Sequence, residues 1–182
     1  MQTFLDHVAE KIASSTHKWD KIKVIVPNNR AIIFLKECFK KVIDRPIIAP
    51  KILTIDEFIK DLSGIKPISK PEIILSFYEV YSENTPIKEL ESFSNFSGWA
   101  SKLIEEFNEI DSQLIDSKEL FNYMIAIKNL ENWRPEKKGE LSKIHYNLQG
   151  KVFIYYNKLY KKLLNSQNGY YGLRIREAIK NL

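Results

Sequence analysis

The sequence predicts an α/β fold, in which a small parallel sheet is followed by a mainly helical half. Two short apolar runs, 22–26 and 51–53, have the length and composition of buried strands. Each run is followed by apolar residues at helical spacing, and strands that are joined through a helix pair in parallel. Beyond residue 71 the spacing stays helical, and we find no strand pattern there.

The N-terminal part is expected to alternate helices with strands. A helix over 2–15 precedes the first strand, and a helix over 30–43 follows it. Ile25 is apolar although it alternates with the inward residues of the strand, which indicates a sheet covered on both faces. The inward face of the second helix is expected to hold Ile33, Phe34, Cys38, Val42 and Ile43.

Capping residues and glycine set the expected ends of the later helices. Thr54 and Glu57 have the spacing of a capping box directly after the second strand, and Gly64 is expected to end that helix. Ser69 and Glu72 indicate the start of the next helix. Further helices are expected near 71–82, 92–110, 117–130, 140–165 and 172–181. Two of them carry clear apolar stripes, formed by Phe96, Trp99, Ala100, Leu103, Ile104, Phe107 and Ile110, and by Leu148, Val152, Tyr155, Leu159 and Leu163.

The net charge of +5 conceals three blocks of different sign. Residues 1–71 carry a net charge of +5, residues 72–131 carry −8, and residues 134–182 carry +8. Blocks of opposite sign can pair inside the fold, or they can present separate basic and acidic faces. The sequence leaves both interpretations open.

The junction between the first strand and the next helix lacks the residues of a phosphate loop. A phosphate loop needs glycine, because backbone N–H groups must approach the phosphates without a Cβ in the way. The first glycine of the chain is Gly64, and no Gly-Lys-Thr or Gly-Lys-Ser occurs. We therefore expect a nucleotide-type fold that has lost its site, with no cofactor in this chain.

Other catalytic and metal-binding patterns are weak or absent. Asp116–Ser117–Lys118 matches a short nuclease element, but it is better interpreted as a helix start. The acidic segment 105–111 is interpreted as a solvated helix face rather than a cation site. The three histidines are scattered, and Cys38 is the only cysteine. We expect no catalytic residue and no metal site.

The long helix expected at 140–165 is rich in lysine and tyrosine. Lysines neutralise phosphates and tyrosines stack on bases, so this composition suits nucleic acid. The alternative is that the lysines keep the helix soluble while the tyrosines pack in the core. The residues concerned are Lys143, Lys151, Lys158, Lys161 and Lys162, interleaved with Tyr146, Tyr155, Tyr156 and Tyr160.

Five phrases occur in the same order as in the N-terminal part of AddB-like proteins, which are inactivated superfamily I helicase and PD-(D/E)XK nuclease subunits. They are "TFLDHVAEKI", "KVIVPNNRAIIFLKECF", "PKILTIDEFI", "WASKLIEEFNEID" and "NGYYGLRIR". The chain most resembles the form found in Bacteroidetes-type bacteria, over nearly its whole length. One departure is Asn29, where a basic residue is expected beside Arg30.

The resemblance implies three regions. Residues 1–68 would be a degenerate P-loop helicase-like (1A) core, residues 69–167 an inserted helical subdomain, and residues 168–182 a helix that returns to the core. Active relatives have a strand and a Walker A loop before the first helix, whereas this sequence starts at Met1 with that helix. The nuclease motif of the family lies far downstream, so the resemblance implies a piece of a longer protein.

By this resemblance the chain would bind and guide DNA, as double-strand ends or single strands, beside an AddA-like motor subunit that hydrolyses ATP. Two alternatives remain: a protein-interaction scaffold that docks the motor without touching DNA, and an enzyme with a divergent or scattered site. The cytoplasm is the default location, because no apolar run approaches the ~20 residues that span a bilayer. Charge and position select the candidate DNA contacts Arg30, Lys36, Lys51, Lys158, Lys161, Lys162, Arg174 and Arg176.

Overall fold

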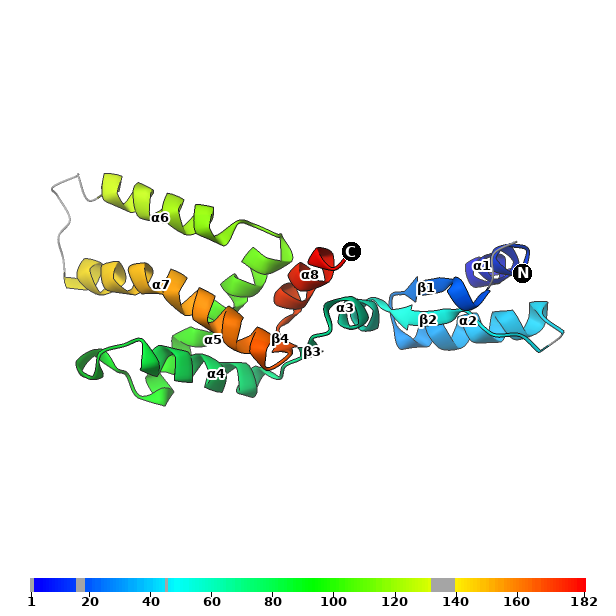
Figure 1. The fold of residues 1–182 in the computed structure, drawn as a ribbon, viewed down its shortest axis with the longest axis horizontal. Coiled ribbons are helices and arrows are strands. Elements are labelled where there is room, and N and C mark those ends of the chain that lie inside the picture. The colour runs from blue at the N-terminus through cyan, green and yellow to red at the C-terminus, as the bar shows by residue number, and fades with distance from the viewer. Residues whose placement is uncertain (1, 16–18, 45, 132–139) are drawn as a thin grey trace. The chain divides into compact units, whose positions relative to one another are not determined.

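The chain folds into two compact units, Met1–Asp61 and Leu62–Leu182, whose elements are labelled in Figure 1. The computed structural model describes residues 2–15, 19–44, 46–131 and 140–182, and it describes side chains outside 127–150. The sequence placed the boundary between residues 68 and 69, and the contacts place it between 61 and 62. Each unit is described separately below.

The first unit contains a two-stranded parallel sheet, β1 (Lys23–Val26) and β2 (Lys51–Thr54). Val24 lies opposite Ile52, and Val26 lies opposite Thr54. This pairing confirms both predicted strands and their parallel direction. The helical elements are α1 (Phe4–Ala13), the short η1 (Trp19–Lys21), α2 (Asn29–Val42) and α3 (Ile55–Ser63), whose last two residues belong to the second unit.

The core of the first unit is small and one-sided. Its buried residues are Ala9, Val26, Leu35, Cys38 and Phe39, from α1, β1 and α2. Cys38 is buried as predicted and Ile43 packs against this core, but the prediction is wrong for Ile33 and Phe34, which are 63% and 54% exposed. Val42 is also exposed, and Ile43 is only half-buried. The apolar residues of α2 occupy most of the helix circumference, so helical periodicity alone could not identify the face that packs.

The second face of the sheet is not covered as the sequence predicted. Val24, Val26 and Ile52 face α1 and α2, so their alternating neighbours point the other way. On that second face Leu53 is buried, whereas Ile25 is 44% exposed. Ile25 is therefore apolar without being buried among the described residues of this unit.

The second unit is helical apart from two very short strands. Its helices are α4 (Lys70–Glu83), η2 (Ile87–Glu89), α5 (Phe93–Ser112), α6 (Ser117–Glu131), α7 (Glu140–Asn165) and α8 (Tyr171–Lys180). The bounds of the five α-helices lie within two residues of the predicted ones, and the short η2 was not predicted. The strands β3 (Lys66–Pro67) and β4 (Asn168–Gly169) pair in parallel and were missed, because two residues are too few to form a pattern.

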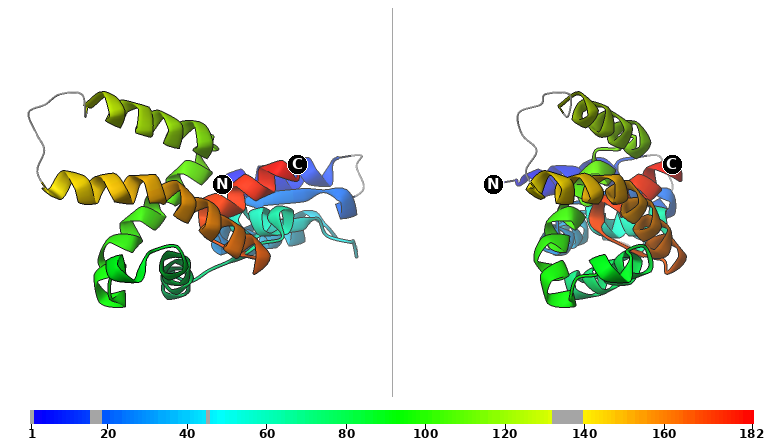
Figure 2. Two further views of the ribbon diagram at one scale, coloured as in Figure 1. Left: turned by 60° about the vertical axis from the view of Figure 1, so that its left-hand side comes forward. Right: turned by 90° about the vertical axis from the view of Figure 1, so that its left-hand side faces the viewer.

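Aromatic side chains fill the centre of the second unit. Phe77 of α4 is fully buried and contacts the rings of Phe96, Phe107 and Tyr155, with centroids 5.1, 6.0 and 6.1 Å away. The two predicted stripes on α5 and α7 are thus confirmed for their described side chains. In this unit α4 packs against α5 and α7, and α8 packs against α5 (Figure 2). The helix α8 therefore belongs to the helical unit.

The helix ends follow the predicted capping chemistry. The Thr54 amide donates to Glu57 Oε2 at 2.8 Å, and the Glu57 amide donates to Thr54 Oγ1 at 3.2 Å. Ser69 and Glu72 form a second capping box at the start of α4. Gly64 has a φ of 69°, the left-handed conformation that ends α3 as expected.

Candidate nucleic-acid interface

The carboxyl edge of the β1–β2 sheet is where a nucleotide-type fold would hold phosphate. Both helices that begin at this edge are capped by their own side chains. The Ala31 amide donates to Asn28 Oδ1 at 2.9 Å in α2, and the Glu57 carboxylate accepts the Thr54 amide in α3. The edge therefore presents an amide oxygen and a carboxylate where a phosphate loop presents N–H groups. Arg30 is exposed in the first turn of α2.

The opposite edge of the same sheet holds a lysine cluster. Lys23 and Lys51 are direct register partners at the starts of β1 and β2, so their side chains emerge on the same face. Like charges directly opposite each other destabilise a strand pair. One acid offsets this repulsion, because Lys51 Nζ lies 2.5 Å from Asp61 Oδ2.

A third lysine adds to this group. Lys60 precedes Asp61 in α3, and the pKa of Asp61 is lowered first by the hydrogen bond from Lys51 and then by the charges of Lys51, Lys23 and Lys60. We call Lys23, Lys51, Lys60 and Asp61 the Asp61 cluster; its formal charge is positive, because it contains three lysines and one carboxylate. Of these residues the sequence had selected Lys51 alone. The missed signal was a lysine at or next to the start of each expected strand, Lys23 in 22–26 and Lys51 in 51–53.

The basic face of α7 is smaller than the sequence predicted. Lys158 and Lys161 are exposed one turn apart and form no ion pair within the described part of the chain. Lys162 instead lies 2.5 Å from Glu79 Oε2, and Lys151 lies 2.7 Å from Glu89 Oε2. Lys36 is exposed on α2, in the other unit. Lys143 and Tyr146 lie outside the residues whose side chains are described.

The tyrosines of α7 pack in the core. Tyr155 is 1% exposed and Tyr156 is 4% exposed, and Tyr160 is half-buried. The packing interpretation is thus confirmed for Tyr155 and Tyr156, which leave no ring face for a base.

Neither arginine of α8 is an exposed surface cation. Arg174 is 2% exposed, so it does not form part of the surface where the sequence placed a DNA contact. Arg176 Nε lies 2.7 Å from Asp111 Oδ1, and Arg176 Nη2 donates to the carbonyl oxygens of Ile110 and Ile115 at 2.9 and 2.6 Å. These contacts cap the C-terminal end of α5, which is a structural role.

Asp111 lies at the centre of a buried polar network that the sequence did not indicate. The segment 105–111 was expected to be a solvated face, yet Asp111 is fully buried. Its carboxylate accepts from the hydroxyls of Tyr156 and Tyr170, each at 2.5 Å. Burial raises the pKa of Asp111, while these hydrogen bonds and Arg176 oppose that effect. In this segment Glu105, Glu106 and Glu109 are exposed as expected.

The opposite charge blocks of the sequence pair inside the fold in at least three places. Glu79, Glu89 and Asp111 come from the acidic block, and they bind Lys162, Lys151 and Arg176 of the C-terminal basic block. This supports the interpretation of internal pairing for those residues. Asp116, from the weak nuclease match, accepts a hydrogen bond from the Glu119 amide at 3.0 Å and so starts α6, as predicted.

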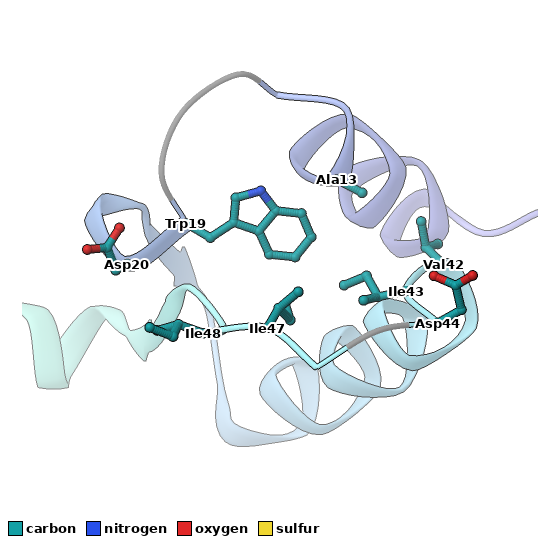
Figure 3. A pocket seen from close by; sticks show the side chains of 8 residues that line it. All are labelled: Ala13, Trp19, Asp20, Val42, Ile43, Asp44, Ile47 and Ile48. Carbon is teal, nitrogen blue, oxygen red and sulfur yellow. The ribbon is translucent and has the colours of Figure 1, made fainter.

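A shallow apolar pocket opens in the first unit (Figure 3). It has a volume of about 420 Å³. The Trp19 indole points toward Ile43 and Ile47, and Asp20 and Asp44 lie at opposite ends of the group. The remaining lining residues are Ala13, Val42 and Ile48. Sequence reasoning did not identify this pocket.

Within the described residues, no three His, Cys, Asp or Glu side chains gather as a metal site requires. Every helix in the same part of the chain is too short or too polar to cross a bilayer. In comparisons with known proteins, no family model matches the chain, and no curated protein matches its sequence.

Proposed function

We propose that this chain is a non-catalytic, helicase-like domain of the AddB-like type, which binds and guides DNA during double-strand break processing and recombinational repair. In this proposal it acts in the cytoplasm beside an AddA-like motor subunit, and a nuclease activity would belong to sequence downstream. The order of five sequence phrases supports the family, and the parallel β–α–β arrangement of the first unit is compatible with it.

The observation that carries DNA binding is the Asp61 cluster. Two lysines held opposite each other by strand register, with a third nearby, create a fixed positive potential that a single carboxylate does not neutralise. Each lysine that contacts a phosphate releases a counterion, which favours binding at low salt. The exposed Arg30 and Lys36 lie on α2 in the same unit and would add to its positive charge.

The carboxyl edge of the sheet argues against a nucleotide site in this proposal. Glu57 occupies the N-terminus of α3, and its negative charge would repel a phosphate there. The enzyme alternative is tested by equilibrium binding of a labelled ATP analogue with magnesium. Binding that is lost in an Asn28→Ala variant would favour a divergent ATPase.

Salt-dependent binding to a labelled, blunt-ended DNA duplex tests the proposal. The variant Lys23→Gln, Lys51→Gln, Lys60→Gln should bind more weakly, and the slope of log affinity against log salt should become shallower by about 2 to 3. A matched control removes the same charge from three exposed lysines of the other unit, through Lys88→Gln, Lys102→Gln and Lys118→Gln. Equal losses in the two variants would contradict the site, and salt-independent binding would contradict the function.

The α7 lysines are tested separately. We replace Lys158 and Lys161 by Gln and spare Lys162, because its ammonium group is already paired with Glu79. If α7 takes part, the salt slope should fall by up to about 2. Unchanged affinity would remove this helix from the interface and leave the Asp61 cluster as the contact.

A second candidate function is a scaffold that docks the motor subunit without touching DNA. The apolar pocket beside Trp19 favours it, together with the strong exposure of Ile48 (75%), Phe4 (78%) and Ile33 (63%) in the same unit. Co-expression with an AddA-like subunit tests this function. Ile48→Asp should abolish the complex, whereas Ile87→Asp, at a residue 90% exposed in the other unit, should have no effect.

A further inference from the structure

The Asp61 cluster differs in its formal charge from two ion pairs of the described residues in the second unit. Lys162–Glu79 and Lys151–Glu89 each match one cation with one anion. In the cluster, three lysines act on the single carboxylate of Asp61. The strand register fixes the backbones of Lys23 and Lys51 opposite each other, so both side chains leave the sheet from neighbouring positions on one face. The cluster therefore carries an excess of positive charge, which a second anion would offset.

The position of Asp61 allows its carboxylate to be replaced. Both partners of the 2.5 Å contact are open to solvent, with Lys51 54% and Asp61 40% exposed. Ion pairs exposed to this extent contribute little to stability, so their exchange has a small free-energy cost. A phosphate oxygen makes the same charge-assisted contact with an ammonium group as a carboxylate oxygen does.

We infer that Asp61 is a built-in competitor for phosphate, and that a phosphate group displaces its carboxylate from Lys51 when ligand binds. This inference rests on the proposed function, and it assigns the regulation of the same site. The intramolecular carboxylate lowers the affinity for any single phosphate. Weak individual contacts suit a domain that guides a moving DNA strand, because each contact must be released as the strand passes.

Removing the competitor should strengthen binding. Asp61→Asn keeps the shape of the side chain and removes its charge, so DNA affinity should rise by about 2- to 5-fold, which corresponds to an exposed ion pair. Asp44→Asn makes the same change in net charge within the same unit and should produce a smaller rise. In a Lys51→Gln background, Asp61→Asn should raise DNA affinity no more than Asp44→Asn does, because the competing contact no longer exists.

The outcomes separate the inference from the function on which it rests. If the unaltered chain fails to bind DNA, the proposed function fails. If the chain binds DNA but Asp61→Asn raises the affinity no more than Asp44→Asn does, the inference alone is overturned. The same holds if Asp61→Asn gives its full gain in affinity in the Lys51→Gln background. Thermal unfolding of each variant confirms that its fold is intact, and Asp61→Ser provides a second variant with the same expected gain.

The Asp61 carboxyl carbon gives a direct NMR readout in the unaltered chain. Its signal should move on titration with the DNA duplex, because the carboxylate leaves Lys51. A matching shift with inorganic phosphate would assign the site to phosphate groups in general, and a shift with DNA alone would assign it to the phosphodiester backbone. A signal that neither ligand moves overturns the inference.

Discussion

The two units of the chain use aspartate in opposite ways. In the second unit, Asp111 is fully buried, and it joins α5 to α7 and α8 through Tyr156, Tyr170 and Arg176. In the first unit, Asp6 lies in the first turn of α1 with its side chain 16% exposed, and it accepts from the Thr3 amide at 2.8 Å. Burial raises the pKa of Asp111, whereas the Thr3 hydrogen bond holds the pKa of Asp6 far below its ordinary range.

This difference matches the way in which each unit is packed. The second unit surrounds its charge with a continuous aromatic core, so the cost of burying that charge is offset by three partners and by close packing. The first unit has a small core and leaves Phe4, Ile33 and Ile48 largely exposed. Its polar contacts tie helices together from outside the core. We therefore expect core polar substitutions to matter most in the second unit.

The largest expected effect is the loss of the buried carboxylate. Asp111→Ala would leave the Arg176 guanidinium and two tyrosine hydroxyls without their acceptor, and removing one partner of a buried pair costs about 3–5 kcal/mol. Urea unfolding of the whole chain measures this loss. Glu105→Ala, which removes an exposed carboxylate 3.6 Å from Lys70, should change the free energy of unfolding by about 1 kcal/mol at most. Similar losses in the two variants would contradict the claim that the buried Asp111 carboxylate stabilises the second unit.

The next effect concerns the close approach of α8 to α5. A Cβ on Gly172 would lie 2.1 Å from the Asn108 carbonyl oxygen, and the Gly172 amide donates to Asn108 Oδ1 at 2.7 Å. Gly172→Ala must therefore move one helix, at a cost of about 1–3 kcal/mol, which calorimetry can measure.

Gly98 of α5 provides a matched control for that substitution. Nothing lies within 4 Å of the Cβ that alanine would add there. Because alanine favours a helix interior over glycine, Gly98→Ala should stabilise the chain by up to about 1 kcal/mol. If both substitutions shift stability in the same direction, the contact at Gly172 does not limit the packing of α8.

The elements of the fold could be predicted from the sequence because their signals are local. Thr54 and Glu57, and the apolar stripe around Phe107, lie within one or a few helical turns, so spacing alone identifies them. The face of α2 could not be identified, because Ile33 and Phe34 are as apolar as the buried Leu35. Only tertiary contacts decide which of these side chains is covered.

The candidate site was less predictable than the fold, because its residues are distant in sequence. Lys23 and Lys51 are separated by an entire helix and meet only through strand register. The basic residues Arg174 and Arg176 look like surface cations in the sequence, and the buried Asp111 that binds Arg176 lies more than sixty residues away. Charge composition indicated that the blocks could pair or stay apart, and it could not indicate which charges would form the pairs.

The smallest expected effect tests Asp6 of the first unit. Asp6 also lies 3.6 Å from Lys41 and interacts with the Cys38 thiol, so its charge links α1 to α2. Because its pKa in the folded chain is lowered, its contribution to stability is fully present above the ordinary Asp pKa of about 4 and is lost as the pH falls below that value. Asp6→Asn should therefore be less stable than the unaltered chain at neutral pH, and the difference should shrink under acid.

Urea unfolding of the two chains at several pH values measures this difference. Asp111 has the opposite effect: because its pKa is raised in the folded chain, its contribution to stability falls as the pH rises through that pKa. Both chains contain Asp111, so this contribution cancels when their stabilities are subtracted. Asp20→Asn is the matched control, with the same charge change at an exposed residue of the same unit. A difference for Asp6→Asn that stays constant from pH 6 to about 3 would show that the Asp6 charge does not stabilise the first unit, and the contrast between the two aspartates would then reduce to burial alone.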